Sequence, residues 1–105
     1  MTHSEILRKA KALIDTPEKW TQGAFARDRI GNQTLNLNDK AVCFCSAGAL
    51  GRLNALDYQS IKIINYLAGV MGDIVGFNDT HTHAEVMAKW DEAIALAEAD
   101  EKEGV

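Results

Sequence analysis

Two cysteines and two histidines are the side chains best suited to chemistry. Cys43 and Cys45 lie two residues apart, and His81 and His83 repeat this spacing. Thiolates and imidazoles are favoured zinc ligands. On a helix, residues two apart point about 200° away from each other, so both sulfurs reach one ion only in a non-helical stretch. We therefore predict no metal site and interpret the cysteines as small buried hydrophobic side chains.

The same residues form no catalytic set that the sequence alone makes recognisable. A reactive thiolate needs an electropositive, partly exposed setting, whereas Cys43 and Cys45 lie in an apolar run. A pairing of either cysteine with His81 or His83 stays open, because it would be spatial rather than local. We predict no catalytic residue and no cofactor, with a small metal-dependent or Cys/His enzyme as the alternative.

Residues 20–29 carry the groups most typical of a ligand site: aromatic rings, an amide and two guanidinium groups. Arginine forks and aromatic faces recognise nucleotides and acidic peptides. In the competing interpretation, aromatic core anchors and a structural Arg27–Asp28 ion pair hold the loop. The ligand-binding residues predicted here are Trp20, Gln22, Arg27, Asp28 and Arg29.

A second group of candidates precedes the last predicted helix. Asn78 and Asp79 lie in a predicted loop, and His81 and His83 flank the cap of that helix. Backbone N–H groups and the positive end of a helix dipole can receive an anion there. A solvated loop end is the competing interpretation. These four residues complete the predicted ligand site.

Two capping boxes predict the first and last helices. Thr2 and Glu5 open a helix that should end near Asp15, with an apolar face of Ile6, Leu7, Ala10, Leu13 and Ile14. Thr82 and Glu85 open the final helix, whose apolar face comprises Val86, Trp90, Ala93, Ile94 and Ala97. The acidic tail, residues 100–105, should fray.

The region between these helices is less regular. After a short helical turn begun by Pro17, residues 21–39 lose the helical period, and a turn at 30–32 favours a short hairpin with a strand at 34–37.

Two more helices should follow. We predict a buried helix over residues 40–55, and then a helix capped by Asp57 and ended by Gly72, with a stripe of Ile61, Ile64, Leu67, Ala68 and Met71. Residues 74–77 should be extended and 78–81 a loop. The predicted fold is mainly α: a small helical bundle of about four main helices with an irregular or β-hairpin excursion near residues 21–39, and a single domain over 1–99.

Length and charge narrow the class of protein. With 105 residues, one domain is expected. Eleven basic residues interspersed among fifteen acidic ones give a net charge of -4, which disfavours direct nucleic-acid binding. The apolar runs are too short for a bilayer span, and the N-terminus lacks a secretory pattern, so we expect no membrane insertion and a cytoplasmic location.

Several blocks together resemble a family of uncharacterised short proteins from bacteriophages and proteobacteria. The blocks are Trp20-x-Gln22-Gly23-Ala24-x-Ala26-Arg27-Asp28, Cys45 with Gly48-Ala49-Leu50, Phe77-Asn78-Asp79, and Thr82-His83-Ala84-Glu85-Val86 with Ala93-Ile94. Phe44 departs from the family, whose members often carry tryptophan there. The resemblance implies a phage or prophage accessory protein and brings no catalytic residue.

The leading functional prediction is a non-enzymatic binding protein of the host-defence antagonist type. Its partner should be a host protein or a sequestered anionic small molecule. Besides the enzyme alternative, a self-associating structural protein stays open, in which the small residues of 47–51 bring two copies together. That alternative predicts a homo-oligomer.

Overall fold

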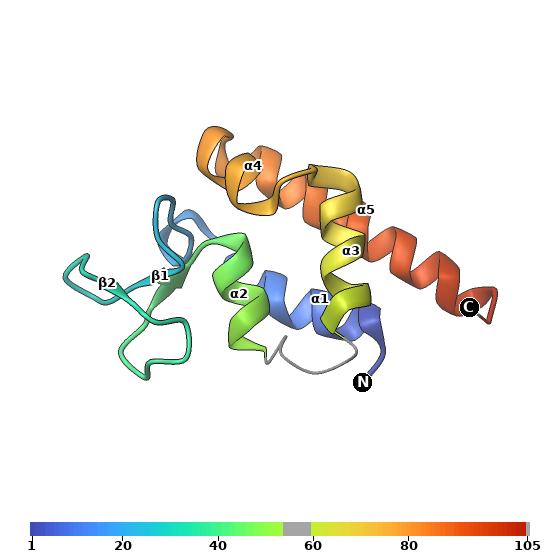
Figure 1. Cartoon of the computed structure of the whole chain (residues 1–105), viewed down its shortest axis with the longest axis horizontal. Coiled ribbons are helices and arrows are strands. Elements are labelled where there is room, and N and C mark those ends of the chain that lie inside the picture. The colour runs from blue at the N-terminus through green and yellow to red at the C-terminus, as the bar shows by residue number, and fades with distance from the viewer. Residues whose placement is uncertain (54–59, 105) are drawn as a thin grey trace.

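The structure is a computed structural model that describes residues 1–53 and 60–104 (Figure 1). Within these ranges the chain is mainly helical, with five α-helices rather than about four, and one small sheet. The elements in chain order are α1 (His3–Ala12), the 3-10 turn η1 (Pro17–Lys19), β1 (Ala26–Arg27), β2 (Gln33–Thr34), β3 (Cys43–Phe44), α2 (Ser46–Arg52), α3 (Ser60–Met71), α4 (Ile74–Thr80) and α5 (His83–Lys102).

The predicted capping residues open α1 and α5. The Thr82 side chain accepts from the Glu85 backbone N–H at 3.2 Å, and Glu85 Oε1 accepts from the Thr82 N–H at 2.9 Å, so this capping box is confirmed. At α1, Thr2 Oγ1 accepts from the Glu5 N–H. The first helix ends at Ala12, slightly before the predicted boundary.

The core lies where α1 and α3 pack against the long α5. Its largest fully buried side chains include Trp90, Leu7 and Leu67. Ser4 at the start of α1 donates from both its N–H and Oγ to Glu101, which fastens the far end of α5 to α1. The helix α5 therefore continues past Ala99 to Lys102, through the first half of the acidic tail. No helix in the described ranges is long and apolar enough to cross a bilayer.

Residues 21–45 form an excursion from one end of the helical body (Figure 1). Its three strands have the order β2-β1-β3 and are antiparallel. The predicted hairpin is present, and Gly31 in its turn has φ +92, a conformation that favours glycine. The strand predicted at 34–37 is shorter and earlier, because only Gln33 and Thr34 pair with β1.

The helix predicted over 40–55 is wrong in its first part. Cys43 and Phe44 are β3, and α2 begins at Ser46. The apolar run suggested a buried helix, but β1 offers Cys43 and Phe44 a strand partner. The small residues of α2 bring it against the excursion: a Cβ on Gly48 would lie 1.9 Å from the backbone oxygen of Phe25.

The segment after α3 is also corrected. Gly72, with φ +80, ends α3 as predicted, but Ile74–Thr80 is the helix α4, not an extended piece followed by a loop. Ile74 and Phe77 pack against the core, and this packing overrides the strand preference of the β-branched sequence. In α3, Ile61 is exposed and Ile63 takes the buried position. The predicted cap Asp57 lies outside the described residues.

Candidate functional site

The centre of the predicted ligand site is Asn78, which is fully buried in α4. Its Oδ1 accepts from the Trp20 Nε1–H at 2.8 Å, and from both the backbone N–H and the Oγ–H of Ser46 at 3.0 Å. Its Nδ2 donates to the Thr21 carbonyl oxygen and to Asp79 Oδ1, each at 3.0 Å. The amide of Asn78 is thus saturated by groups of its own chain.

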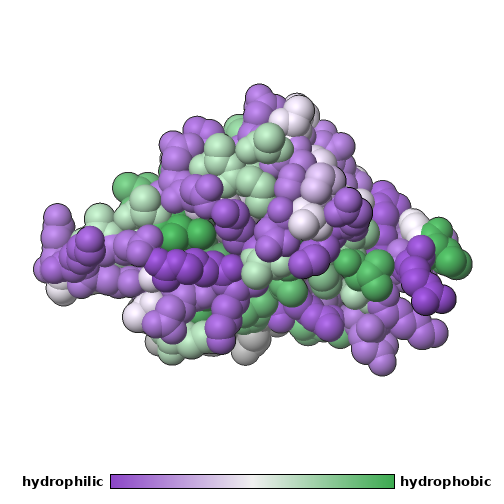
Figure 2. Space-filling view, turned by 180° about the vertical axis from the view of Figure 1, so that it is seen from behind, coloured by the Kyte–Doolittle hydropathy of each residue, from purple (hydrophilic) through white to green (hydrophobic). Residues whose placement is uncertain are grey.

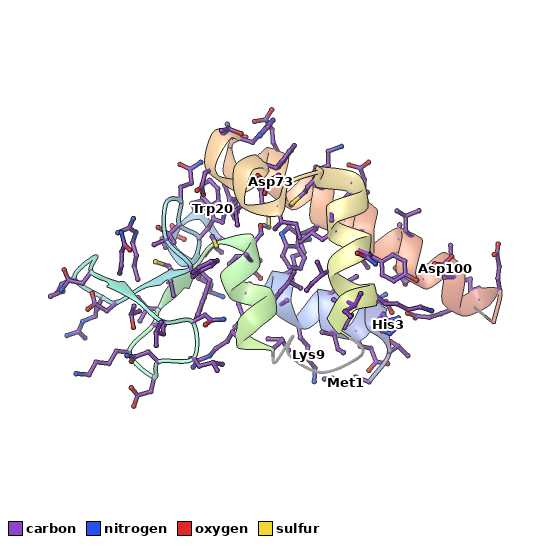
Figure 3. All side chains as sticks on the ribbon, viewed as in Figure 1. Met1, His3, Lys9, Trp20, Asp73 and Asp100 are labelled. Carbon is purple, nitrogen blue, oxygen red and sulfur yellow. The ribbon has the colours of Figure 1, made fainter. Side chains whose placement is uncertain are left out.

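Ser46 extends this network into the core. While its hydroxyl donates to Asn78, its Oγ accepts from the Trp90 Nε1–H at 3.0 Å. Both indole N–H groups therefore end on the Asn78–Ser46 pair, which joins the excursion, α2, α4 and α5. Figure 3 shows Trp20 at the junction between the excursion and the helical body. We name these four residues the Asn78 network.

Gln22 and Asp79 fasten the loop that follows Trp20. The Gln22 Nε2 group donates to the carbonyl oxygens of Asn78 and His81, both at 3.0 Å. The Gly23 N–H donates to Asp79 Oδ1 at 3.1 Å. Because the sequence separation of these pairs is near 56 to 59 residues, they are tertiary anchors rather than local turn contacts.

Arg27 and Asp28 hold the excursion together, but not by the ion pair predicted as one alternative. The Arg27 guanidinium donates to Thr21 Oγ1 and to the carbonyl oxygens of Gln22 and Gly31, at 2.9 to 3.1 Å. Asp28 Oδ1 instead accepts from the backbone N–H groups of Ile30 and Asn32. The fork of Arg27 is therefore occupied by its own chain.

The two histidines also use ring nitrogens internally. His81 stacks on Phe77 with ring centroids 3.6 Å apart, and its Nδ1–H donates to the Phe77 carbonyl oxygen at 2.9 Å. His83 Nε2–H donates to the Ile14 carbonyl oxygen at 2.8 Å, and its ring meets Trp20 edge-on. The capping box already engages Thr82 and Glu85 at the start of α5, where an anion was predicted to bind.

The cysteines lie in extended and capping positions, so the helical premise of the zinc argument is wrong. Cys43 is in β3, and Cys45 caps α2 with its Sγ accepting from the Gly48 N–H at 3.3 Å. Burial raises the pKa of the Cys45 thiol, and the nearby Asp79 carboxylate raises it further. Within residues 1–53 and 60–104, no three His, Cys, Asp or Glu side chains are grouped closely enough to hold a metal ion.

A shallow hollow of about 220 Å³ opens beside the network, between the excursion and α4. Phe25 and Val75 are its large apolar side chains, 58% and 41% exposed. We call it the Phe25 hollow, and it is lined by Gly23, Ala24, Phe25, Gln33, Val75 and Asp79. Its floor is fixed, because Gly23 and Asp79 are hydrogen-bonded to each other.

The structure brings most predicted site residues to one place. Six of the nine meet around Asn78: Trp20, Gln22, Asn78, Asp79, His81 and His83. Arg27 adjoins them through Gln22, while Arg29 and Asp28 line a different hollow at the tip of the sheet. Sequence reasoning missed Ser46, Trp90 and Val75 as parts of the site. Their positions in apolar segments pointed only to the core.

The chain is thus a small, mainly helical protein in which a buried asparagine joins a three-stranded excursion to the helical body. A sequence model of the family described as "Family of unknown function (DUF6197)" matches residues 1–96, and the chain belongs to this family. The predicted membership of an uncharacterised family is thereby confirmed. No match was found among curated proteins or among solved structures.

Proposed function

We propose that this protein is a non-enzymatic binding protein whose target is another protein, contacted at the Phe25 hollow. The observation that carries the proposal is the pairing of two exposed apolar side chains, Phe25 and Val75, with a floor that internal hydrogen bonds hold rigid. Apolar anchors on a preorganised surface are the usual source of affinity between proteins, because little side-chain freedom is lost on binding.

A protein target has more support than an anionic small molecule. Binding an anion needs available guanidinium or N–H donors, and each of the three nitrogens of the Arg27 guanidinium already donates to an acceptor of its own chain. The Phe25 hollow contains the Asp79 carboxylate, which repels negative charge. An apolar segment with a hydrogen-bond donor fits this surface better.

The enzyme alternative has less support than either form of binding. A nucleophilic thiol needs a lowered pKa and access, whereas Cys45 is buried and its pKa is raised. The His81 Nδ1 atom is hydrogen-bonded to the Phe77 carbonyl oxygen and the Thr80 hydroxyl, and His83 Nε2–H donates to the Ile14 carbonyl oxygen. None of these bonds joins a histidine to a cysteine nucleophile.

The biological setting in this proposal comes from the resemblance and is an analogy. The protein acts as a phage or prophage accessory protein in the bacterial cytoplasm, where it blocks a host factor as an antagonist of host defence.

The test combines in-cell capture with a quantitative measurement. A photoreactive phenylalanine analogue at position 25 should crosslink one host protein, and calorimetry with that purified protein should show binding that Phe25→Ser with Val75→Ser weakens by at least about tenfold. The matched control is Leu96→Ser, which removes an apolar side chain of similar exposure from α5.

Two results would contradict this proposal. If the double variant binds the captured protein as tightly as the wild type, the Phe25 hollow is not the contact surface. If inorganic phosphate or a nucleotide binds with an affinity that Arg27→Ala abolishes, the target is an anion and Arg27 is available to it.

A further inference from the structure

A second hollow lies at the tip of the excursion, away from the Asn78 network. It has a volume of about 430 Å³ and is formed by the turn between β1 and β2 together with the chain that enters β3. Ile30 is 80% exposed, and Val42 is 49% exposed. We call it the Ile30 hollow, and it is lined by Asp28, Arg29, Ile30, Asp39, Lys40 and Val42. Figure 2 shows green, hydrophobic side chains reaching the surface at this end of the molecule.

The charges around the Ile30 hollow balance. Two are positive, Arg29 and Lys40, and two are negative, Asp28 and Asp39, so the patch sums to zero in a chain of net charge -4. None of the four forms an ion pair with any residue in 1–53 or 60–104. The patch thus offers both signs of charge to an incoming surface.

The equal number of positive and negative groups favours some binding partners of the Ile30 hollow over others. A nucleic acid or an anionic lipid surface needs an excess of positive charge, and a strongly charged peptide of either sign meets as much repulsion as attraction. A second copy of the same surface carries the same two positive and two negative groups, so a two-fold arrangement can place Arg29 and Lys40 of each copy opposite the carboxylates of the other. We propose that a second copy of this chain docks on the Ile30 hollow, so that Ile30 and Val42 of both copies are buried together.

Hydrogen bonds hold the tip of the excursion in one conformation, so it does not have to become ordered when a second copy binds. Asp28 Oδ1 accepts from the N–H groups of Ile30 at 3.1 Å and Asn32 at 2.9 Å, which fixes the turn. The Val42 N–H donates to the Arg27 carbonyl oxygen at 2.9 Å, which fixes the opposite wall. Preorganisation lowers the entropic cost of association, but a patch of six residues is small. The dimer is therefore weak and forms at high protein concentration.

The position of this dimer differs from that of the self-association predicted from the small residues of α2. Gly48 of α2 faces the backbone of Phe25, and Gly51 faces the side chain of Asn36, where an added Cβ would lie 2.0 Å from Nδ2. Gly48 is therefore covered by the excursion of its own chain, and Gly51 is partly covered by it. The excursion itself then carries the contact between copies.

Sedimentation equilibrium of the purified chain, from about 10 µM to about 1 mM, tests the proposal because a small interface is expected to populate a dimer only at high protein concentration. We expect a monomer–dimer equilibrium that weakens at high salt, since the patch charges are exposed. A chain that stays monomeric at the highest concentration would overturn the proposal.

Charge reversal locates the interface. Arg29→Glu with Lys40→Glu makes the patch wholly acidic, and Asp39→Lys makes it mainly basic; Asp28 is left intact because it holds the turn. Each variant alone should dimerise at least about tenfold more weakly than the wild type, and an equimolar mixture of the two should recover a dimer. Variants that still dimerise alone, or a mixture that stays monomeric, would refute the two-fold contact.

Two controls separate this inference from the proposed function. Leu96→Lys on α5 should leave the dimer unchanged, and so should Phe25→Ser with Val75→Ser, which lie at the other hollow. Ile30→Ser provides a check without any change of charge and should weaken dimerisation. Circular dichroism of each variant verifies that the exposed substitutions leave the fold intact.

Discussion

Asn78 is the side chain on which the structure should depend most. Replacement by leucine leaves the buried backbone N–H of Ser46 and the part-buried indole N–H of Trp20 without an acceptor. An unsatisfied buried donor costs about 1–3 kcal/mol, so Asn78→Leu should lower the free energy of unfolding by about 3 kcal/mol or more. Urea unfolding followed by circular dichroism measures this loss. A change no larger than that of the exposed control Asn65→Ala would show that the network contributes little.

The two thiols should react at different rates. Cys43 is half-buried, whereas Cys45 is 2% exposed and its pKa is raised by burial. Because the thiolate is the reactive form, native protein should be alkylated by iodoacetamide at Cys43 well before Cys45. Peptide mass spectrometry after timed quenching measures both rates. Rapid alkylation of Cys45 would revive the Cys/His enzyme alternative.

Tyr66 should titrate late. Its hydroxyl donates to Asp100 at 2.6 Å, and this carboxylate raises the pKa of Tyr66 to about 12 from its ordinary value of 10.0. The bond therefore stabilises the fold fully below pH 10.0 and is lost as the pH rises through the folded value. Absorbance at 295 nm, as the difference between wild type and Tyr66→Phe, follows this phenol. Asp100→Asn should move its pKa back toward 10.0.

The candidate site was predictable in position but not in role. Trp20, Gln22, Asn78 and His83 carry polar atoms in segments that break the helical period, and the structure does bring them together. Residue types do not reveal which donors and acceptors are already satisfied within the chain. The saturation of the Asn78 amide depends on the buried hydroxyl of Ser46. The sequence places Ser46 in an apolar run, where nothing indicates that its hydroxyl bonds to Asn78.

At the scale of elements, the contact between α2 and the excursion can be tested with a pair of glycines. Gly48→Ala places a Cβ 1.9 Å from the Phe25 backbone oxygen. Because the backbone of Phe25 cannot move away without disturbing β1, we expect the free energy of unfolding to fall by about 2 kcal/mol or more. Gly69→Ala in α3 meets nothing within 4 Å and should instead stabilise by about 0.5–1 kcal/mol. Thermal unfolding of both variants gives the comparison. Equal effects would show that the close approach at Gly48 is not restrictive.

Elements with their own local signals were predicted, and elements decided by tertiary contacts were not. The capping box at Thr82 and the glycine at 72 fix the ends of α5 and α3 through backbone chemistry that can be read locally. The helix α4 has a strand-like sequence, and β3 lies in a run that also suits a buried helix. Both depend on neighbours more than fifteen residues away, which no local pattern encodes.

At the scale of the whole molecule, the Asn78 network should make the excursion and the helical body unfold together. The strands have only two residues each, too few to be stable without the contacts to Asn78 and Gly48. Urea curves from circular dichroism, which follows the helices, and from tryptophan fluorescence should therefore coincide. Two separated midpoints would mean that the excursion detaches before the body unfolds.

The two indoles of the Asn78 network differ in solvent exposure, so tryptophan fluorescence should report on binding without an added label. Trp90 is completely buried, whereas Trp20 is half-buried beside the His83 ring and is joined through Asn78 to Asp79, which lines the Phe25 hollow. Emission should therefore contain a blue, unquenchable part and a redder part that dissolved acrylamide can reach. A protein that covers the Phe25 hollow should shield only the second part. Occupancy of that surface can then be followed in unlabelled protein, with Trp90 as the internal reference.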